Sequence, residues 1–149
     1  MPSISTSAAA SFDQAAGPAT PTRNSRAGLW AGRVLSGLVI TFLAFDAAMK
    51  LLQVEPAVKG TAELGYPVHT LFGIGLVELL CVIAYVVPRT SLFGAVLLTG
   101  YLGGAIATHV RLGNPLFSHV LFPIYVAALI WGGLYLRDAA LRAFLRRTP

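Results

Sequence analysis

The sequence predicts an all-α membrane protein, an antiparallel bundle of four transmembrane helices with both termini in the cytoplasm. The first reason is composition: 56% of the 149 residues are hydrophobic and 11% are charged, whereas soluble domains carry about 25% charged residues. The second is a series of four apolar segments, and the third is the placement of most arginines outside them. No basic stripe with interleaved aromatic residues is present, so nucleic-acid binding is not expected.

The first 28 residues differ in composition from the rest of the chain. They are rich in Ser, Ala, Thr and Pro and show no apolar periodicity, which predicts a disordered cytoplasmic tail. A cleaved signal peptide is not expected, because Arg23, Arg26 and Arg33 come late and the apolar run behind them is too long. Residues 29–137 then form the transmembrane domain, and residues 138–149 form a basic amphipathic cytoplasmic tail.

Each of the four apolar segments has the length of a membrane span. A helix needs about 17–25 residues to cross a hydrocarbon core of about 30 Å. Arginines lie before the first segment, between the second and third, and after the fourth, whereas the two opposite loops carry only Lys59 and Arg111. The positive-inside rule therefore places both termini in the cytoplasm. The segments cover residues 34–52, 71–87, 92–110 and 117–136.

Turn residues separate the last three segments. Residues 86–91 predict a short cytoplasmic hairpin in which Pro88 ends one helix and Thr90 or Ser91 caps the next. Residues 111–117 contain Gly, Asn and Pro in succession, which predicts an equally tight outer turn. Tight turns make these three segments antiparallel neighbours.

Two shorter helices are expected outside the spans. In the longer first outer loop, residues 56–65 predict an interfacial helix that begins at Pro56 and stops at Gly65. After the fourth segment, residues 137–147 place three large apolar residues among arginines. Two interpretations of that segment remain open: an amphipathic helix on the anionic cytoplasmic leaflet, or a solvated charged tail that only fixes orientation.

Six ionisable residues gather in the outer half of the predicted bundle. A charged residue deep in a span costs about 2.5–3.5 kcal/mol, so such residues usually face the bundle interior, pair, or serve function. Asp46 and Lys50 lie one helical turn apart, and Lys50 is within reach of Glu78 on the next helix. The group is either an outward-facing ligand or proton pocket, or a salt-bridged network that fixes helix register. Its members are Asp46, Lys50, Glu78, His109, Arg111 and His119.

Thiol and metal chemistry find little support. Cys81 is the single cysteine, which excludes an intrachain disulfide, a dithiol pair and a thiolate-rich metal site. We interpret it as a small buried hydrophobic residue. The three histidines do not have the spacing of a metal motif, so neither a metal nor a haem is expected. The cofactor stays unknown, with a quinone left open.

The third segment carries a stripe of small residues that lets another helix approach closely. The stripe continues into Arg111, which is therefore expected to point toward a protein neighbour, with Glu78 or Asp46 as candidates. A homo-oligomer is also compatible with it. The stripe consists of Gly100, Gly103, Gly104 and Ala107.

The ordered combination of FDAAMKLL, AELGYP, GIGLVELLCVIAYVVPRT and ATHVRLGNP resembles the DoxX-like membrane proteins over residues 30–137. This resemblance implies a four-helix bundle in the bacterial inner membrane. Founding members of the family are similar to a subunit of a thiosulfate:quinone oxidoreductase, and other relatives associate with oxidant-defence proteins. The polar positions of the family correspond here to Lys50, Glu78, His109 and Arg111, whereas Asp46 departs from the pattern.

Three functions remain open at this stage. The resemblance favours an accessory subunit of quinone-linked or oxidant-defence redox chemistry, with a partner protein that supplies the redox centre. The alternative is a small-molecule binder or transporter in which Lys50 and Arg111 hold an anion and Glu78 is coupled to protonation. The third is a structural scaffold whose polar cluster only locks helix packing. Whether the protein is an enzyme stays undecided.

Overall fold

The computed structural model describes residues 26–147, and this part of the chain is helical with short connections. The predicted tail of residues 1–28 lies outside the described residues, except for 26–28, which belong to the first helix. The all-α prediction is confirmed for the described residues. The elements are α1 (Arg26–Leu51), α2 (Glu55–Glu63), α3 (Thr70–Val86), α4 (Ser91–Arg111), the π-helical turn η1 (Leu116–Val120), α5 (Phe122–Arg137) and α6 (Ala139–Arg147).

Three stretches of the described residues are long and apolar enough to cross a membrane. They are α1, α4 and the combined stretch of η1 and α5, with mean hydropathies of 1.8, 1.5 and 1.7. The fourth apolar helix, α3, has 17 residues and is shorter. Large apolar side chains cover the outside of these helices, among them Trp30 and Phe45, which are 66% and 65% exposed. A surface of this kind is suited to lipid rather than to water.

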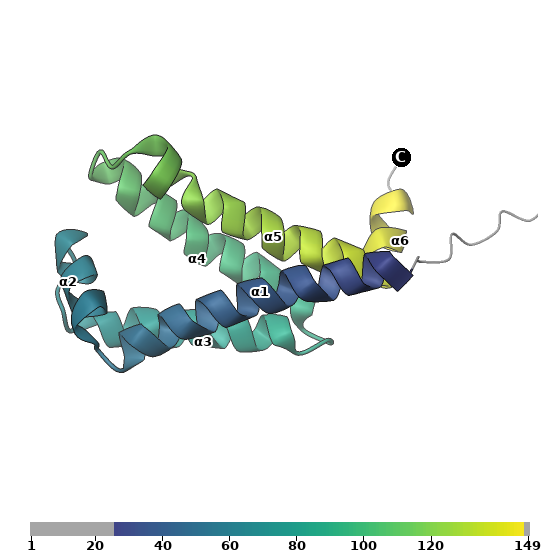
Figure 1. The fold of residues 1–149 in the computed structure, drawn as a ribbon, viewed down its shortest axis with the longest axis horizontal. Helices are drawn as coiled ribbons and strands as arrows, with labels where there is room; N and C mark the ends of the chain where they lie inside the picture. Colours follow the sequence, from purple (N-terminus) through teal and green to yellow (C-terminus); the bar gives the residue numbers. More distant parts are fainter. Residues whose placement is uncertain (1–25, 148–149) are drawn as a thin grey trace, which may run out of the picture.

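The four long helices each contact two neighbours. Both α1 and α4 pack against α3 and α5. Figure 1 shows the pair α1–α3 and the pair α4–α5 close together near the start of α1 and diverging toward the end where α2 lies. The core between them includes Val39, Leu98, Ile130 and Leu134, and also Cys81, which is buried as expected.

A buried tyrosine joins three helices at the narrow end. The hydroxyl of Tyr85 in α3 donates to the Ile130 carbonyl at 2.9 Å and lies 3.0 Å from Ser36 Oγ of α1. Arg137 at the end of α5 donates to the Tyr85 carbonyl at 3.1 Å, and its guanidinium lies 4.7 Å from the ring centre. These contacts hold α1, α3 and α5 together on the side of the molecule away from α2.

Close helix approach occurs at glycines other than the predicted stripe. A Cβ on Gly94 would lie 2.2 Å from Tyr85 N, and a Cβ on Gly75 would lie 2.7 Å from Lys50 Cβ. By contrast, a Cβ on Gly100, Gly103 or Gly104 would meet no atom within 4 Å. Within the described residues the stripe of Gly100, Gly103, Gly104 and Ala107 is therefore exposed and does not pack against another helix. Its packing against a second copy stays a prediction.

The α3–α4 connection is a tight turn, but its hydroxyls do not cap α4 as predicted. Thr90 occupies the N-cap position without a side-chain cap hydrogen bond. Its hydroxyl donates instead to the Ala84 carbonyl at 2.8 Å, and Ser91 Oγ donates to the Pro88 carbonyl at 3.2 Å. The last carbonyls of a helix need donors as much as the first amides need acceptors. Here the Thr90 hydroxyl serves the end of α3, whereas the Ser91 hydroxyl serves a carbonyl of the turn itself.

Three helix ends near α2 share one backbone motif. Gln53, Gly65 and Gly113 have φ of 50°, 77° and 67° and follow α1, α2 and α4. After α4, for example, Gly113 N donates to the Val110 carbonyl and Asn114 N to the His109 carbonyl. This is the Schellman arrangement, in which a left-handed residue ends a helix. It makes the turn after α4 as tight as the sequence indicates.

Both short helices are present. The first, α2, runs from Glu55 to Glu63 with Pro56 in its first turn, close to the predicted 56–65. The second, α6, is capped by Asp138 Oδ1, which accepts from the backbone amides of Ala140 and Leu141 at 2.8 and 3.1 Å. Leu141 is buried against the long helices, whereas Phe144 is 68% exposed. A helix rather than an extended tail thus follows α5.

Candidate functional site

Lys50 is the centre of a polar cluster contributed by α1, α3 and α4. Its Nζ donates to Asp46 Oδ2 at 2.5 Å, to Glu78 Oε2 at 2.7 Å and to the Tyr101 hydroxyl at 2.9 Å. Tyr101 in turn donates to Glu78 Oε2 at 2.8 Å. The predicted contacts of Lys50 with Asp46 and Glu78 are therefore present. We call Asp46, Lys50, Glu78 and Tyr101 the lysine cluster.

Local structure explains how the cluster forms. Asp46 and Lys50 are spaced i, i+4 in α1, so their side chains lie on one face of the helix. Gly75 has no side chain where α3 crosses α1, and this close approach brings Glu78, one turn further along α3, to Lys50. Any larger residue at position 75 would press against Lys50 Cβ and the Ala47 carbonyl.

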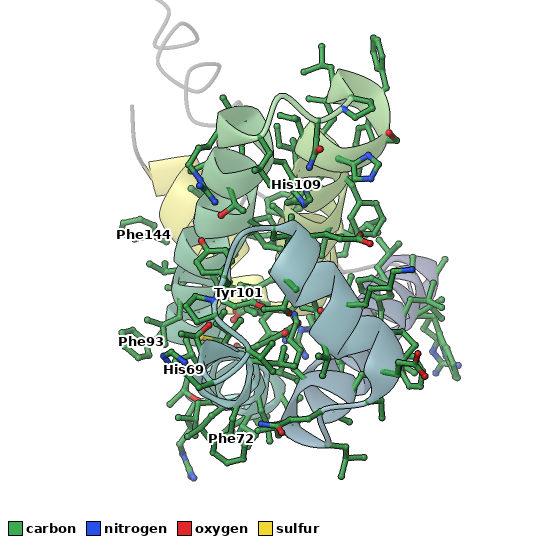
Figure 2. The ribbon with its side chains drawn as sticks, turned by 90° about the vertical axis from the view of Figure 1, so that its left-hand side faces the viewer. His69, Phe72, Phe93, Tyr101, His109 and Phe144 are labelled. Atoms are coloured by element: carbon green, nitrogen blue, oxygen red, sulfur yellow. The ribbon has the colours of Figure 1, made fainter. Side chains whose placement is uncertain are left out.

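Tyr101 is the member of the cluster that sequence reasoning missed. It follows Gly100 within the glycine-rich segment and carries no charge, so its polar role was not apparent. A tyrosine in the middle of an apolar span does carry a signal, because a buried phenol usually finds a hydrogen-bond partner. Figure 2, which faces the α2 end of the molecule, labels Tyr101 and His109, which both belong to α4.

Glu78 is the most enclosed member. Its side chain has no exposed surface, whereas those of Lys50 and Asp46 are 18% and 41% exposed. Its Oε2 accepts from Lys50 and Tyr101, while its Oε1 is buried without a hydrogen-bond partner among the described residues. The cluster thus has two carboxyl groups, one ammonium group and one open acceptor.

The lysine cluster forms part of the wall of a cavity of about 510 Å³. This cavity lies among α1, α2, α3, α4 and α5, where the two helix pairs diverge. Its remaining wall is mostly apolar, and Gly100 and Gly104 of the small-residue stripe widen it because they carry no side chain. The apolar lining includes Phe42, Leu43, Ile74, Phe122, Pro123 and Val126.

A second cavity of about 490 Å³ lies on the α2 side of the cluster. Asp46, Lys50 and His109 border both cavities, so the two adjoin. The second is more polar, with Glu63, Asn114 and His119 in its wall. We call it the mouth.

The two predicted histidines lie together at the mouth. The rings of His109 and His119 are 5.5 Å apart and edge to face. His109 Nδ1 lies 2.9 Å from Asn114 Nδ2, and His119 Nδ1 lies 2.8 Å from Ser118 Oγ. His119 belongs to η1. Turns of π-helix are rare in proteins as a whole, but those that occur are often at functional sites. Among the described residues, no hydrogen bond or ring contact joins either histidine to Glu78.

Arg111 does not join the lysine cluster as expected. It is exposed, and its Nη2 donates to the Leu64 carbonyl at 2.9 Å, at the end of α2. The prediction that it points toward Glu78 or Asp46 is therefore wrong, since it lies in the last turn of α4 and turns outward to the α2–α3 loop. Nearby, the Tyr66 hydroxyl donates to Thr108 Oγ1 at 2.8 Å, because Thr108 donates to the Gly104 carbonyl. Both contacts attach this loop to α4.

The described residues contain no group of three or more His, Cys, Asp or Glu side chains arranged to hold a metal ion. The chemistry that the cluster offers is that of ion pairs, hydrogen bonds and proton exchange beside an apolar cavity.

Comparison with known proteins identifies one family. Residues 34–133 match the sequence model of the DoxX-like family. No match was found among curated proteins or among solved structures.

Proposed function

The chain belongs to the DoxX-like family and is a multi-pass membrane protein, and from this premise we propose that it binds a small amphipathic molecule as an accessory to quinone-linked redox chemistry. One observation carries the proposal: an ion-paired cluster with an open acceptor lies in the wall of a cavity of about 510 Å³. Ligand pockets typically measure about 300–1,000 Å³, with apolar walls and a few polar groups. The cavity has this composition.

We further propose the topology that this function needs. All four long helices, α3 included, cross a bacterial inner membrane as an antiparallel bundle, and both termini are cytoplasmic. The mouth then opens toward the outer leaflet, and α2 lies at that interface. The distribution of arginines supports this orientation. At about 1.5 Å per residue, the 17 residues of α3 extend about 26 Å, close to the hydrocarbon thickness.

A quinone-type head group fits the chemistry of this cavity. The ring would pack against the apolar wall while its oxygens lie near the lysine cluster. His109 borders both the cavity and the mouth, so it is the residue we assign to proton exchange with the outer surface. In this proposal a partner protein supplies the redox centre.

The alternative is an anion binder or proton-coupled transporter. It requires free cationic groups at the cavity, but Lys50 already donates to three partners and Arg111 does not line either cavity. A scaffold role, the third alternative, predicts that the cavity has no occupant. The binding proposal therefore requires that a ligand occupies the cavity.

The test fills the cavity without disturbing helix packing. Gly104 lines the cavity and Gly103 does not, yet a Cβ at either position meets nothing within 4 Å. We expect quinones or hydroquinones to raise the unfolding midpoint of detergent-purified wild type and of Gly103→Leu, but not of Gly104→Leu. At a ligand concentration of 100 Kd, the stabilisation is about 2.7 kcal/mol. If no compound shifts the wild type, the binding function is wrong and a scaffold remains.

A further inference from the structure

One oxygen of the buried Glu78 carboxyl group has no partner. The side chain is fully buried, and Oε1 makes no hydrogen bond with any described residue. A buried acceptor without a donor destabilises the folded state, and more so when it is charged. Such groups are few in native proteins, so each requires an explanation. Glu78 is among the residues that line the cavity, and because its side chain has no exposed surface, an occupant must displace neighbouring atoms to contact Oε1.

The donors around Glu78 are already used. An ammonium group has three N–H bonds, and those of Lys50 serve Asp46, Glu78 and Tyr101. The single hydroxyl hydrogen of Tyr101 goes to Glu78 Oε2. An incoming acceptor, such as a carbonyl or a carboxylate, would therefore find no free N–H or O–H in the lysine cluster. An incoming donor would find Glu78 Oε1.

The charge of the cluster favours the same kind of ligand. Two carboxyl groups face one ammonium group, and Glu63 adds a further acid at the mouth. Arg111 lines neither cavity, and its guanidinium donates to the Leu64 carbonyl. The lining of the two cavities thus holds three carboxyl groups and one ammonium group, a balance that favours a cationic or neutral ligand over an anion.

We infer that the cavity recognises its ligand through a hydrogen-bond donor: an apolar body carrying a hydroxyl or a protonated amine that donates to Glu78 Oε1. This inference rests on the proposed binding function and specifies its ligand class. Hydroquinones and lipophilic ammonium compounds share this chemistry. A quinone carbonyl only accepts, so its oxygen would face the carboxylate without a hydrogen between them. The site therefore selects the reduced form of a quinone pair over the oxidised form.

Matched probe pairs test the inference on the full chain in lipid nanodiscs. The first pair is a short-chain benzoquinone and its hydroquinone, kept reduced under anaerobic conditions; the second is phenylpropylammonium and phenylpropionate. We expect at least one donor probe to bind the wild type about tenfold more tightly than its matched acceptor, which corresponds to about 1.4 kcal/mol. Glu78→Gln supplies a donor in place of the open acceptor, so this preference should fall to about twofold or reverse.

Tyr85→Phe is the control variant. Tyr85 lies in the same helix as Glu78 and is equally buried, but it belongs to the narrow end and does not line either cavity. It should keep the donor preference of the wild type. A loss of preference in both variants would overturn the inference, because the effect would then come from general loosening of α3.

The remaining outcomes separate the inference from the proposed function. If acceptor probes bind the wild type as tightly as donor probes, the inference is wrong and the binding function stands. If no probe binds, both are wrong. Binding of the ammonium compound alone supports the inference and overturns the quinone role. Should Glu78→Gln fail to fold, infrared difference spectra of the wild type decide: the donor probe must shift a carboxylate band, and an unchanged band overturns the inference.

Discussion

At the scale of single residues, the lysine cluster depends on Lys50. The ammonium group contacts one carboxyl group on its own helix, one on α3 and the phenol of α4, so it joins three helices through one atom. Removing one partner from a buried pair leaves an uncompensated charge, which is strongly destabilising, whereas replacing the whole pair with neutral groups is often tolerated. The cluster is therefore expected to be cooperative.

Lys50→Met should destabilise the protein by about 3–5 kcal/mol, because Glu78 then stays buried without its cation. The double variant Lys50→Met with Glu78→Gln should recover most of this loss. Reversible unfolding in detergent micelles measures both, and the double-mutant cycle gives the coupling between the two side chains. A double variant as unstable as Lys50→Met alone would contradict the ion-pair account.

A substitution at Gln53 tests the backbone conformation after α1 rather than the lysine cluster. Gln53 is the only residue other than glycine with positive φ among the described residues, at the position that Gly65 and Gly113 occupy after their helices. A left-handed conformation costs a residue with a Cβ about 1–2 kcal/mol. Gln53→Gly should therefore stabilise the protein by about 1 kcal/mol in chemical denaturation. Equal or lower stability would show that the Gln53 side chain compensates for its backbone.

At the scale of helices, packing is set by small residues at a few crossings. Gly94 is the tightest: its missing Cβ leaves room for the backbone of Tyr85. A stripe of glycines was visible in the sequence, but which glycines meet a neighbour depends on how the helices rotate about their axes. Periodicity identifies a face without identifying its partner. The predicted stripe on α4 consequently meets no neighbouring helix, while Gly32, Gly75, Gly94 and Gly133 lie at close contacts.

Gly94→Ala should lower stability by about 1–3 kcal/mol or more, since its Cβ would overlap backbone atoms that cannot rotate away. Gly73→Ala is the matched control in α3, because a Cβ there meets nothing within 4 Å. Replacing this helical glycine should be neutral or gain about 0.5–1 kcal/mol. Thermal unfolding of the two variants side by side measures the difference, and equal midpoints would contradict the close α3–α4 crossing.

At the scale of the whole molecule, the sequence predicts elements better than contacts. Apolar length and turn residues identified all four long helices and α2, because these signals are local, whereas the sequence leaves the segment that forms α6 open between a helix and a solvated tail. Asp46, Lys50 and Glu78 were expected to meet because opposite charges in an apolar region must pair. Tyr101 was missed and Arg111 was misassigned, since a neutral side chain gives no charge signal and an arginine at a helix end can turn either way. The cavity depends on the divergence of the helix pairs, which no local pattern encodes.

The proposed topology makes a prediction that also decides whether α3 crosses the bilayer. Lys59 in α2 and Arg89 in the α3–α4 turn are both exposed, and α3 lies between them. In a Cys81→Ser background, a membrane-impermeant maleimide added to intact spheroplasts should label Lys59→Cys and leave Arg89→Cys unlabelled until the membrane is opened. The reverse pattern would place both termini outside. Labelling both positions, or neither, would mean that the 17-residue helix does not span, because its two ends then lie on one side and the mouth cannot open to the outer leaflet as proposed.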